Sequence, residues 1–380
     1  GGYHDEDWYS CFESYYPTLI NEKGDFKSSI EQVPIRIFRK SFITGLRGDF
    51  KTGSVTHNMV FSYDKQWSSG YMGDWAAGYN MTFFGNIYNN SIEKYPKPIV
   101  DEVTWDPYKK KQSAGLSLVD TMEWNRLTAL IGVRHQKEQV EGGYNASATS
   151  PSFGLMYKLN NNVSVYGNWM QGLITGTEVR KEYANKGQYL DPVKTTQREF
   201  GFKWDKGNLG GTLSYFHINQ QIPYADPVTN IYDYNGKQQS KGASFTVYGD
   251  ITEKLHLLGG MSFMNVKNIG GTYDGNRYCG TPKWIGTLAM TYDVTDAFSL
   301  NTRLMYNSSA WADNKNTKKI GAWTRLDLGA KYKWTNMKNP MTLSCNVINV
   351  LGHKYWYGAG DNSVYLGTPR TFVVSLGIDF

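Results

Sequence analysis

Aromatic side chains concentrate in a few stretches that separate runs of alternating polarity. These stretches include WSSGYMGDW, NIYDYNG, SSAWADN and HKYWYGAGDNSVYLG. Aromatic faces can stack on a large organic ligand, and tyrosine hydroxyls can hydrogen-bond its carbonyl groups. The alternative is that the rings only pack loops against one another. The candidate ligand contacts are Trp67, Tyr71, Trp75, Tyr232, Tyr234, Trp311, Tyr355, Trp356, Tyr357 and Tyr365.

Residues that could ligate a metal or act as nucleophiles are scattered. The 6 histidines include no two at ligand spacing, and the 3 cysteines, Cys11, Cys279 and Cys345, form neither a metal motif nor an obvious disulfide framework. His353 lies beside Tyr355 and Trp356, but a position at the end of a strand explains it as well. The sequence offers no Ser-His-Asp order and no close carboxylate pair. We therefore expect no enzyme, no metal site and no resident cofactor.

Charge and hydropathy exclude two further classes of protein. With 40 Lys and Arg against 34 Asp and Glu, the net charge is +6 and the basic residues are dispersed. This distribution does not support nucleic-acid binding. No run approaches the roughly 18 apolar residues of a membrane helix, which excludes helical membrane proteins only. Barrel strands hide their apolar residues by alternation, so average hydropathy misses them.

The last residues, YLGTPRTFVVSLGIDF, alternate strictly. Phe372, Val374, Leu376, Ile378 and Phe380 occupy every second position, and the intervening positions are mostly small or polar. Successive side chains of a strand point to opposite faces, so one face of this segment is apolar. Such a strand either caps a soluble sandwich or lies in a barrel wall between lipid and water.

The same alternation recurs along the chain and predicts about fifteen or sixteen strands. Four of them lie in the segments AFSLNTRLMYN, GAWTRLDLGAKYKW, MTLSCNV and RTFVVSLGIDF. The others are expected at 40–51, 56–67, 112–122, 126–138, 147–158, 162–173, 195–205, 208–220, 239–250, 255–267 and 280–292, and less clearly at 8–15.

Short polar turns and longer loops follow one another along the chain. Segments such as FKTGSV, MEWNR and DKGN are short, whereas 68–111, 174–194 and 221–238 are long. This pattern is typical of a transmembrane antiparallel β-barrel with short turns on the periplasmic side. Aromatic residues beside the short turns fall on the apolar face, as in a girdle at a membrane boundary. Membership of the opposite girdle is a further alternative for the aromatic candidates.

Several segments together resemble the TonB-dependent outer-membrane siderophore receptors. They are QSAGLSLVDTMEWNRLTALIGVRHQ, TTQREFGFKWDKGNLGGTLSYFHINQQ, GKQQSKGASFTVYGDITEKLHLLGGMSF, DGNRYCGTPKWIGTLAMTYD and the C-terminal NVINVLGHKYWYG and YLGTPRTFVVSLGIDF. The resemblance covers about residues 40–380, and it is closest to the ferrichrome-type branch.

The resemblance implies an all-β barrel of about 22 strands that is filled by an N-terminal plug. A short box in that plug contacts the TonB protein of the inner membrane. Neither the plug nor about the first six strands can be recognised here, so residues 1–380 are expected to be the C-terminal part of the barrel domain. A barrel that closes on itself without a plug is the alternative, and it would form a passive pore.

The function expected from the resemblance is import of a ferric siderophore across the outer membrane of a Gram-negative cell, energised through TonB by way of the plug. The expected partners are the iron–siderophore chelate, the TonB complex and the lipid bilayer, and the barrel is expected to be monomeric. The alternatives are a receptor for cobalamin or haem, a plugless diffusion porin and an outer-membrane enzyme.

Overall fold

The computed structural model describes residues 2–15, 18–73, 81–86, 104–334 and 339–379. Strands account for all the regular structure in these ranges. Within the same ranges, no helix is long and apolar enough to cross a membrane. The chain is therefore an all-β protein.

Sixteen strands are eight residues or longer. They are β1 (Gly2–Tyr15), β3 (Asp25–Thr52), β4 (Val55–Gly73), β6 (Trp105–Trp124), β7 (Leu127–Val140), β8 (Asn145–Lys158), β9 (Val163–Ile174), β10 (Val193–Lys206), β11 (Leu209–Ala225), β12 (Tyr232–Thr252), β13 (Leu255–Ile269), β14 (Trp284–Asp293), β15 (Phe298–Asn307), β18 (Trp323–Trp334), β19 (Met341–Ile348) and β22 (Thr371–Ile378). The short strands are β2 (Thr18–Leu19), β5 (Met81–Asn86), β16 (Ala310–Trp311), β17 (Lys319–Ile320), β20 (Trp356–Gly360) and β21 (Ser363–Leu366).

The long strands correspond one to one with those predicted from the alternation, and the least clear prediction, 8–15, is confirmed by β1. The short strands were not predicted, because two to six residues carry too little alternation to be recognised. β3 begins at Asp25 rather than near residue 40. Pro34 and the polar residues around it interrupt the pattern there, although the backbone of Pro34 still pairs with Cys11.

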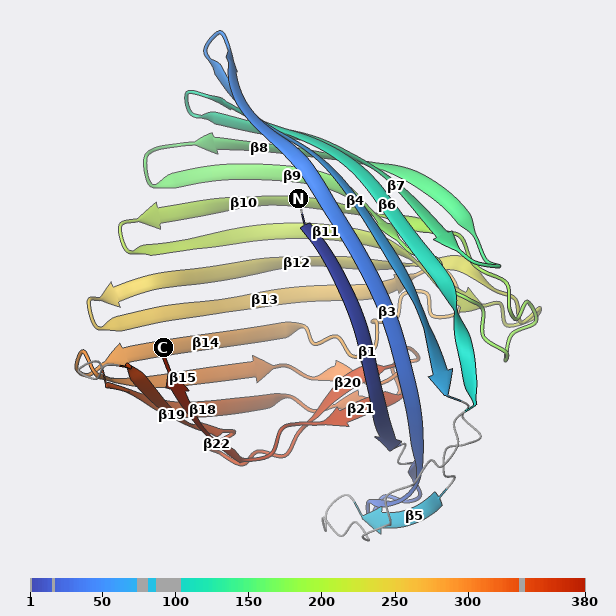
Figure 1. Cartoon of the computed structure of the whole chain (residues 1–380). Helices are drawn as coiled ribbons and strands as arrows, with labels where there is room; N and C mark the ends of the chain where they lie inside the picture. Colours follow the sequence, from blue (N-terminus) through green and yellow to red (C-terminus); the bar gives the residue numbers. More distant parts are fainter. Residues whose placement is uncertain (1, 16–17, 74–80, 87–103, 335–338, 380) are drawn as a thin grey trace. The chain divides into compact units, whose positions relative to one another are not determined.

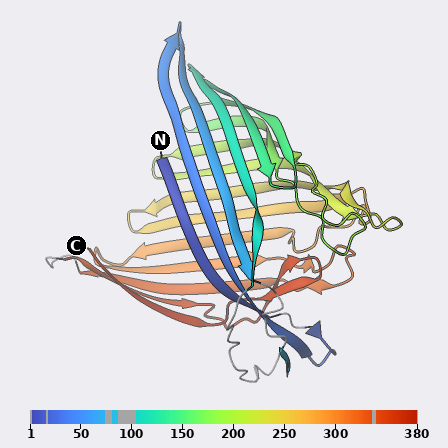
Figure 2. The same ribbon diagram turned by 45° about the vertical axis from the view of Figure 1, so that its right-hand side comes forward.

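The chain divides into two compact units. The first comprises Gly1–Arg47, Val60–Leu118 and Arg134–Thr149. In it, β1 and β3 pair antiparallel from Gly2 opposite Ile43 to Tyr15 opposite Ile30, and Figures 1 and 2 show the two strands side by side. Arg134 donates two parallel hydrogen bonds to the Asp64 carboxylate, at 2.7 and 2.9 Å. This bidentate ion pair ties β7 to β4 within the unit.

The second unit comprises Gly48–Met59, Val119–Val133 and Ser150–Phe380. Its strands form an antiparallel meander in which each strand pairs with the next, from β8 through β15 and then through β18, β19 and β22. Figure 1 shows short turns at one end of β8–β13 and longer connections at the other. The predicted segregation of loop lengths is thus present within this unit.

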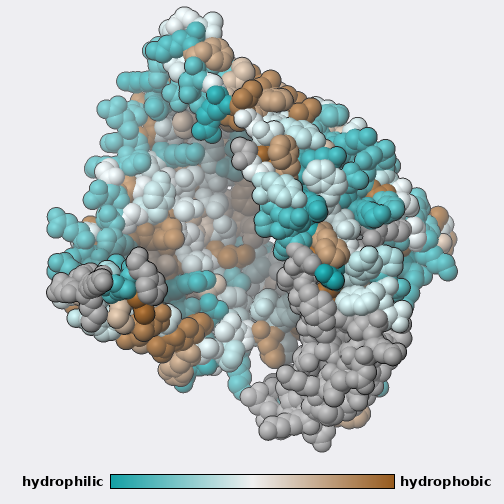
Figure 3. Space-filling view, viewed as in Figure 1, coloured by the Kyte–Doolittle hydropathy of each residue, from teal (hydrophilic) through white to brown (hydrophobic). Residues whose placement is uncertain are grey.

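The two faces of the meander differ in polarity, as the alternation predicts. Across β15 and β18, Leu304 pairs with Leu326, whereas the next pair is Arg303 and Asp327. The apolar row of the last strand is exposed, with Phe372 at 73% and Val374 at 69%. A sandwich core would bury this row, so the soluble alternative is wrong and the row is suited to contact lipid. In Figure 3, hydrophilic residues project on the left, where the short turns of Figure 1 lie.

Many buried apolar residues of the second unit lie in the long connections between the barrel strands. Val179, Leu190, Cys279, Ala310 and Ile320 are all less than 8% exposed. The loops therefore pack into a core of their own, and this core positions the candidate site.

Candidate ligand-binding site

The loop between β15 and β18 is folded around one carboxylate. Asp313 is 2% exposed and accepts hydrogen bonds from the backbone N–H groups of Thr317 and Lys318 and from the Thr317 hydroxyl, at 2.7 to 3.2 Å. Burial by itself raises the pKa of the Asp313 carboxyl, but the hydrogen bonds and the nearby Lys318 outweigh this effect. Together they lower the pKa below its ordinary value. Asn316 takes the left-handed conformation, with φ 59°, that a tight turn requires and asparagine tolerates.

Asn314, the next residue, joins this loop to two others. Its side-chain oxygen accepts a hydrogen bond from the backbone N–H of Cys279 at 3.2 Å. Its backbone N–H donates to the Asp361 carboxylate at 2.9 Å. Asn276 donates to the carbonyl of Asn314 at 3.0 Å. The loops that contain residues 270–283, 308–322 and 349–370 are therefore cross-linked. We call these three loops the asparagine-linked cluster.

A second asparagine fixes the start of the last loop. Asn349 is fully buried and left-handed, with φ 55°, and its side-chain amide donates to the carbonyls of His353 and Thr368, each at 2.9 Å. Its backbone N–H donates to the Asp327 carboxylate at 2.8 Å. The two ends of the loop are thus held together and anchored on β18.

Aromatic stacking continues this anchoring. Tyr355 is 7% exposed and stacks on Trp323 of β18, with ring centroids 4.3 Å apart. Trp323 and Arg325 belong to the polar face, opposite the apolar row. Arg325 forms a salt bridge to Asp327 at 3.0 Å and donates a longer bond to the Tyr355 hydroxyl at 3.5 Å.

Tyr357 and Tyr365 lie on the β20–β21 hairpin, beyond the buried stack. They pair across the two strands with ring centroids 5.6 Å apart, and they are 43% and 60% exposed. Gly358 lies so close to Gly280 that a Cβ at position 358 would meet the Gly280 Cα at 2.4 Å. This contact fixes the hairpin against the 270–283 loop and leaves two aromatic faces open to a ligand.

A second aromatic group connects the loops that follow β9 and β11. Tyr183 stacks on Tyr232 with ring centroids 4.5 Å apart. The side-chain amide of Asn185 donates to the carbonyl of Tyr232 and accepts a hydrogen bond from its backbone N–H. The side-chain amide of Asn230 donates to the carbonyl of Glu182. Burial, reinforced by Tyr183, raises the pKa of the Tyr232 hydroxyl, so this hydroxyl is a neutral donor at physiological pH.

The structure therefore places the sequence candidates in different settings. Tyr355 is buried in packing, and Trp311, Trp356, Tyr232 and Tyr234 are half-buried. Tyr232 and Tyr234 were predicted in a loop, but they begin β12. Trp67 and Tyr71 belong to β4 of the first unit, where Lys65 lies over the Trp67 ring at 4.7 Å and Tyr71 contacts Phe38. Trp75 falls outside the described residues.

Sequence reasoning missed several aromatic residues of the same loops. Tyr224 donates to the side chain of Asn268 at 2.6 Å and makes an edge contact with Tyr273. Burial raises the pKa of the hydroxyls of Tyr224, Tyr273 and Tyr278. The segment GGTYDGNRYCG, between β13 and β14, contains two of them, and its tyrosine content was the available signal.

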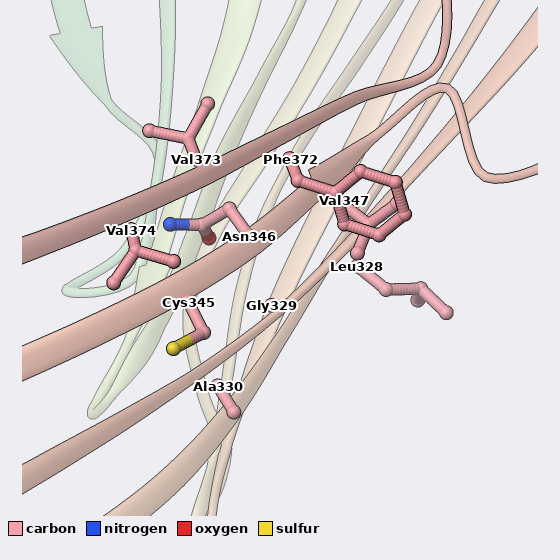
Figure 4. Close-up of a pocket in the computed structure, with 9 residues that line it drawn as sticks. All are labelled: Leu328, Gly329, Ala330, Cys345, Asn346, Val347, Phe372, Val373 and Val374. Atoms are coloured by element: carbon pink, nitrogen blue, oxygen red, sulfur yellow. The ribbon is translucent and has the colours of Figure 1, made fainter.

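The exposed rings and the hydrogen-bonding groups of these loops are suited to holding an organic ligand. Among the described residues, no group of three His, Cys, Asp or Glu side chains could hold a metal ion. A hollow of about 280 Å³ lies on β18, β19 and β22, and Figure 4 shows the residues that line it. It contains none of the aromatic candidates, and Leu328, Cys345 and Phe372 in its lining belong to the apolar row.

An antiparallel meander with an exposed apolar face, short turns at one end and packed loops at the other defines the wall of an outer-membrane β-barrel. A family model described as "TonB dependent receptor-like, beta-barrel" matches residues 3–350. The chain belongs to this family and is an outer-membrane protein of a Gram-negative bacterium.

Two curated relatives and one solved structure illustrate the similarity. The ferrichrome receptor FcuA of Yersinia enterocolitica is 28% identical over 96% of this chain and 51% of its own length. The probable TonB-dependent siderophore receptor PiuA of Acinetobacter baumannii is 25% identical over 82% of this chain and 48% of its own length. The structure of BauA, the ferric preacinetobactin receptor of Acinetobacter baumannii, matches with a TM-score of 0.86 and 26% identity over 100% of this chain and 60% of that chain. The chain spans about half the length of these curated relatives.

Proposed function

We propose that residues 1–380 form part of the barrel of a receptor that imports a ferric siderophore across the outer membrane. Membership of the TonB-dependent receptor-like family supports this assignment. So do the functions of its relatives, which include a ferrichrome receptor and a ferric preacinetobactin receptor. Import would be energised through TonB, and the barrel would act as a monomer in the bilayer without enzymatic chemistry.

The observation that carries the proposal is the asparagine-linked cluster with its exposed aromatic pair. Cross-linked loops hold Tyr357 and Tyr365 in place before a ligand arrives, so little conformational freedom is lost on binding. Two adjacent aromatic faces can stack on the organic shell of a chelate, and their hydroxyls can bond its carbonyl groups.

The other candidates take different roles in this proposal. Trp311, Trp356, Tyr232 and Tyr234 are half-buried and would border the ligand. Tyr355, which is buried, would position the loop rather than touch the ligand. Trp67 and Tyr71, which belong to β4 of the first unit, and Trp75, which lies outside the described residues, stay predicted ligand contacts. Iron would stay inside its chelate, because the protein needs no ligands of its own to recognise the organic shell.

The test is ligand binding by the full-length receptor, followed through tryptophan fluorescence. We expect quenching by one ferric siderophore from a panel of ferric hydroxamates and ferric catecholates, and none by haem or cobalamin. Replacing both exposed rings (Tyr357→Ala with Tyr365→Ala) should weaken binding by about tenfold or more, since each aromatic contact contributes about 0.5–1.5 kcal/mol.

The matched control is Tyr306→Ala. Tyr306 is similarly exposed, at 41%, but it lies on the apolar face of β15. This variant should bind like the wild type. Tight binding of haem or cobalamin, with no response to any ferric siderophore, would refute the proposed substrate class.

A further inference from the structure

We propose that the side chain of Asn268 couples the two aromatic groups of the candidate site, so that loosening one group loosens the other. The first group is the stack of Tyr183 on Tyr232. The second is the exposed pair of Tyr357 and Tyr365 on the β20–β21 hairpin. The importance of this coupling for ligand binding rests on the proposed function, whereas the coupling itself can be measured without a ligand.

Asn268 is the next-to-last residue of β13 and is 0% exposed, so its side-chain amide has no access to water. The amide oxygen accepts a hydrogen bond from the Tyr224 hydroxyl at 2.6 Å. The amide N–H donates a longer bond to the side-chain oxygen of Asn314 at 3.4 Å. Burying an amide is costly unless both of its ends are bonded. Asn268 and its two neighbours therefore hold one another in place.

The backbone of Asn268 is fixed as well. Its N–H donates to the carbonyl of Asn276 at 2.8 Å, and its carbonyl accepts a hydrogen bond from Gly275 at 2.9 Å. The end of β13 is thus paired with the returning part of the 270–283 loop. The amide that joins Tyr224 to Asn314 is therefore mounted on a rigid element.

Tyr224 carries the connection toward the first aromatic group. It lies at the end of β11, and the residue after it, Ala225, pairs directly with Tyr232 of β12. Figure 1 shows β11, β12 and β13 as adjacent strands. The Tyr224 ring is enclosed, because an added Cβ would meet it at 2.7 Å from Gly236 and at 2.9 Å from Gly271. A displacement of Tyr232 is therefore passed on to the Tyr224 ring and its hydroxyl.

Asn314 carries the connection toward the second group. Its backbone N–H donates to the carboxylate of Asp361, which lies in the turn between β20 and β21, at 2.9 Å. At the same turn, the backbone N–H of Asn362 donates to the carbonyl of Ala312 at 2.8 Å. This turn joins the two strands that present the exposed pair. The position of the exposed pair therefore depends on the segment around Asn314.

The two connections meet at Asn268. A parallel link runs through Asn276, which donates to the Asn314 carbonyl at 3.0 Å and accepts a hydrogen bond from the backbone of Asn268. That link connects Asn314 to β13, whereas the hydrogen-bonded step from β13 to Tyr224 is the side chain of Asn268. Removing the amide would leave the Tyr224 hydroxyl without this partner and would let the two groups move separately.

Hydrogen exchange of the full-length receptor in detergent, without a siderophore, tests the coupling. The reporters are the backbone amides of Asn314 and Asn362, which belong to the connection toward the exposed pair. Tyr224→Phe removes the central hydrogen bond and keeps the ring. The matched control is Tyr189→Phe, which removes a hydroxyl bond to Glu178, of 2.7 Å, in the loop that follows β9. Heat-dependent mobility on gels shows that each variant is folded.

We expect exchange at the two reporter amides to accelerate about fivefold or more in Tyr224→Phe and to stay within about twofold of the wild type in the control. Unchanged exchange in Tyr224→Phe, or an equal acceleration in both variants, would overturn the proposal. Since no siderophore is used, the coupling can fail while the proposed function holds, and the proposed function can fail while the coupling holds.

A second comparison separates coupling from a purely local role of the amide. Tyr183→Ala removes the stack of the first group and should accelerate exchange at the reporter amides by about threefold or more. In an Asn268→Leu background, the same substitution should change this exchange by less than about 1.5-fold, because the connection is already lost. An equal effect of Tyr183→Ala in both backgrounds, or no effect in either, would overturn the proposal.

Discussion

Tyr355 stacks on Trp323 with ring centroids 4.3 Å apart, although one residue lies in the last long loop and the other begins β18. This contact packs the loop against β18 of the barrel wall. Three of the long loops of the second unit are likewise joined through Asn314, whose side chain accepts a hydrogen bond from Cys279 and whose backbone N–H donates to Asp361. A ligand that binds the exposed rings therefore acts on a connected structure.

The Tyr355→Ala variant should loosen the last loop without unfolding the barrel. Removing a buried aromatic ring costs about 3–5 kcal/mol, and here the loss falls on the loop packing. We expect rapid cleavage between residues 349 and 370 by an added protease, with unchanged heat-dependent mobility of the barrel. Tyr355→Phe keeps the stack and should resist protease like the wild type. Equal resistance of the alanine variant would show that the stack does not hold the loop.

Acid should open the loop that Asp313 organises. Hydrogen bonds lower the pKa of this carboxyl in the folded protein, so their stabilisation is complete above its ordinary value of 3.8 and is lost as the pH falls through the lowered value. Hydrogen exchange at the Thr317 and Lys318 amides should therefore accelerate, relative to unstructured peptides, only under strongly acidic conditions. In Asp313→Asn, exchange at these amides should already be about tenfold faster at neutral pH and should not respond to acid. A wild-type profile in this variant would exclude the carboxylate as the organiser.

Cys279 should be chemically inert in the folded receptor. It is 3% exposed, and burial raises the pKa of its thiol to about 11, so little thiolate exists at neutral pH. In a variant with Cys11→Ser and Cys345→Ser, a water-soluble maleimide should label Cys279 only after denaturation. Labelling of intact cells within minutes at pH 7 would mean that the asparagine-linked cluster opens readily.

Adjacent residues of β15 test which face meets lipid. Leu304 lies on the apolar face and is 42% exposed, whereas Met305 lies on the other face, opposite Arg325. Leu304→Lys should destabilise the barrel by about 2–4 kcal/mol in lipid, since a charge near the membrane centre cannot be solvated. Met305→Lys should cost less than about 1 kcal/mol. Urea unfolding in lipid vesicles measures both, and the reverse order would contradict the assignment of the faces.

The alternation of the sequence was enough to predict the long strands, because lipid on one side and a polar interior on the other impose period two. The pattern fades where strands continue beyond the lipid. Gln238 and Gln239 point to opposite faces of β12 and are both polar, so the extension of this strand to Tyr232 could not be recognised. The misplacement of Tyr232 and Tyr234 in a loop has the same physical cause.

The sequence predicted the candidate site only through stretches that are rich in aromatic residues. That Tyr355 is buried while Tyr357 is exposed depends on Trp323, which is distant in the sequence. The links from Asn314 to Cys279 and Asp361 likewise join separate loops. Such contacts leave no pattern in the neighbouring sequence, because the fold of the barrel brings together residues that are far apart in the chain.

The central claim is import of a ferric siderophore, and uptake of radioactive iron by cells measures it directly. We expect a strain that lacks the gene to lose uptake of one ferric siderophore, and the intact gene to restore it only when TonB is present. Uptake that is the same with and without the gene, for every ferric siderophore supplied, would contradict the account.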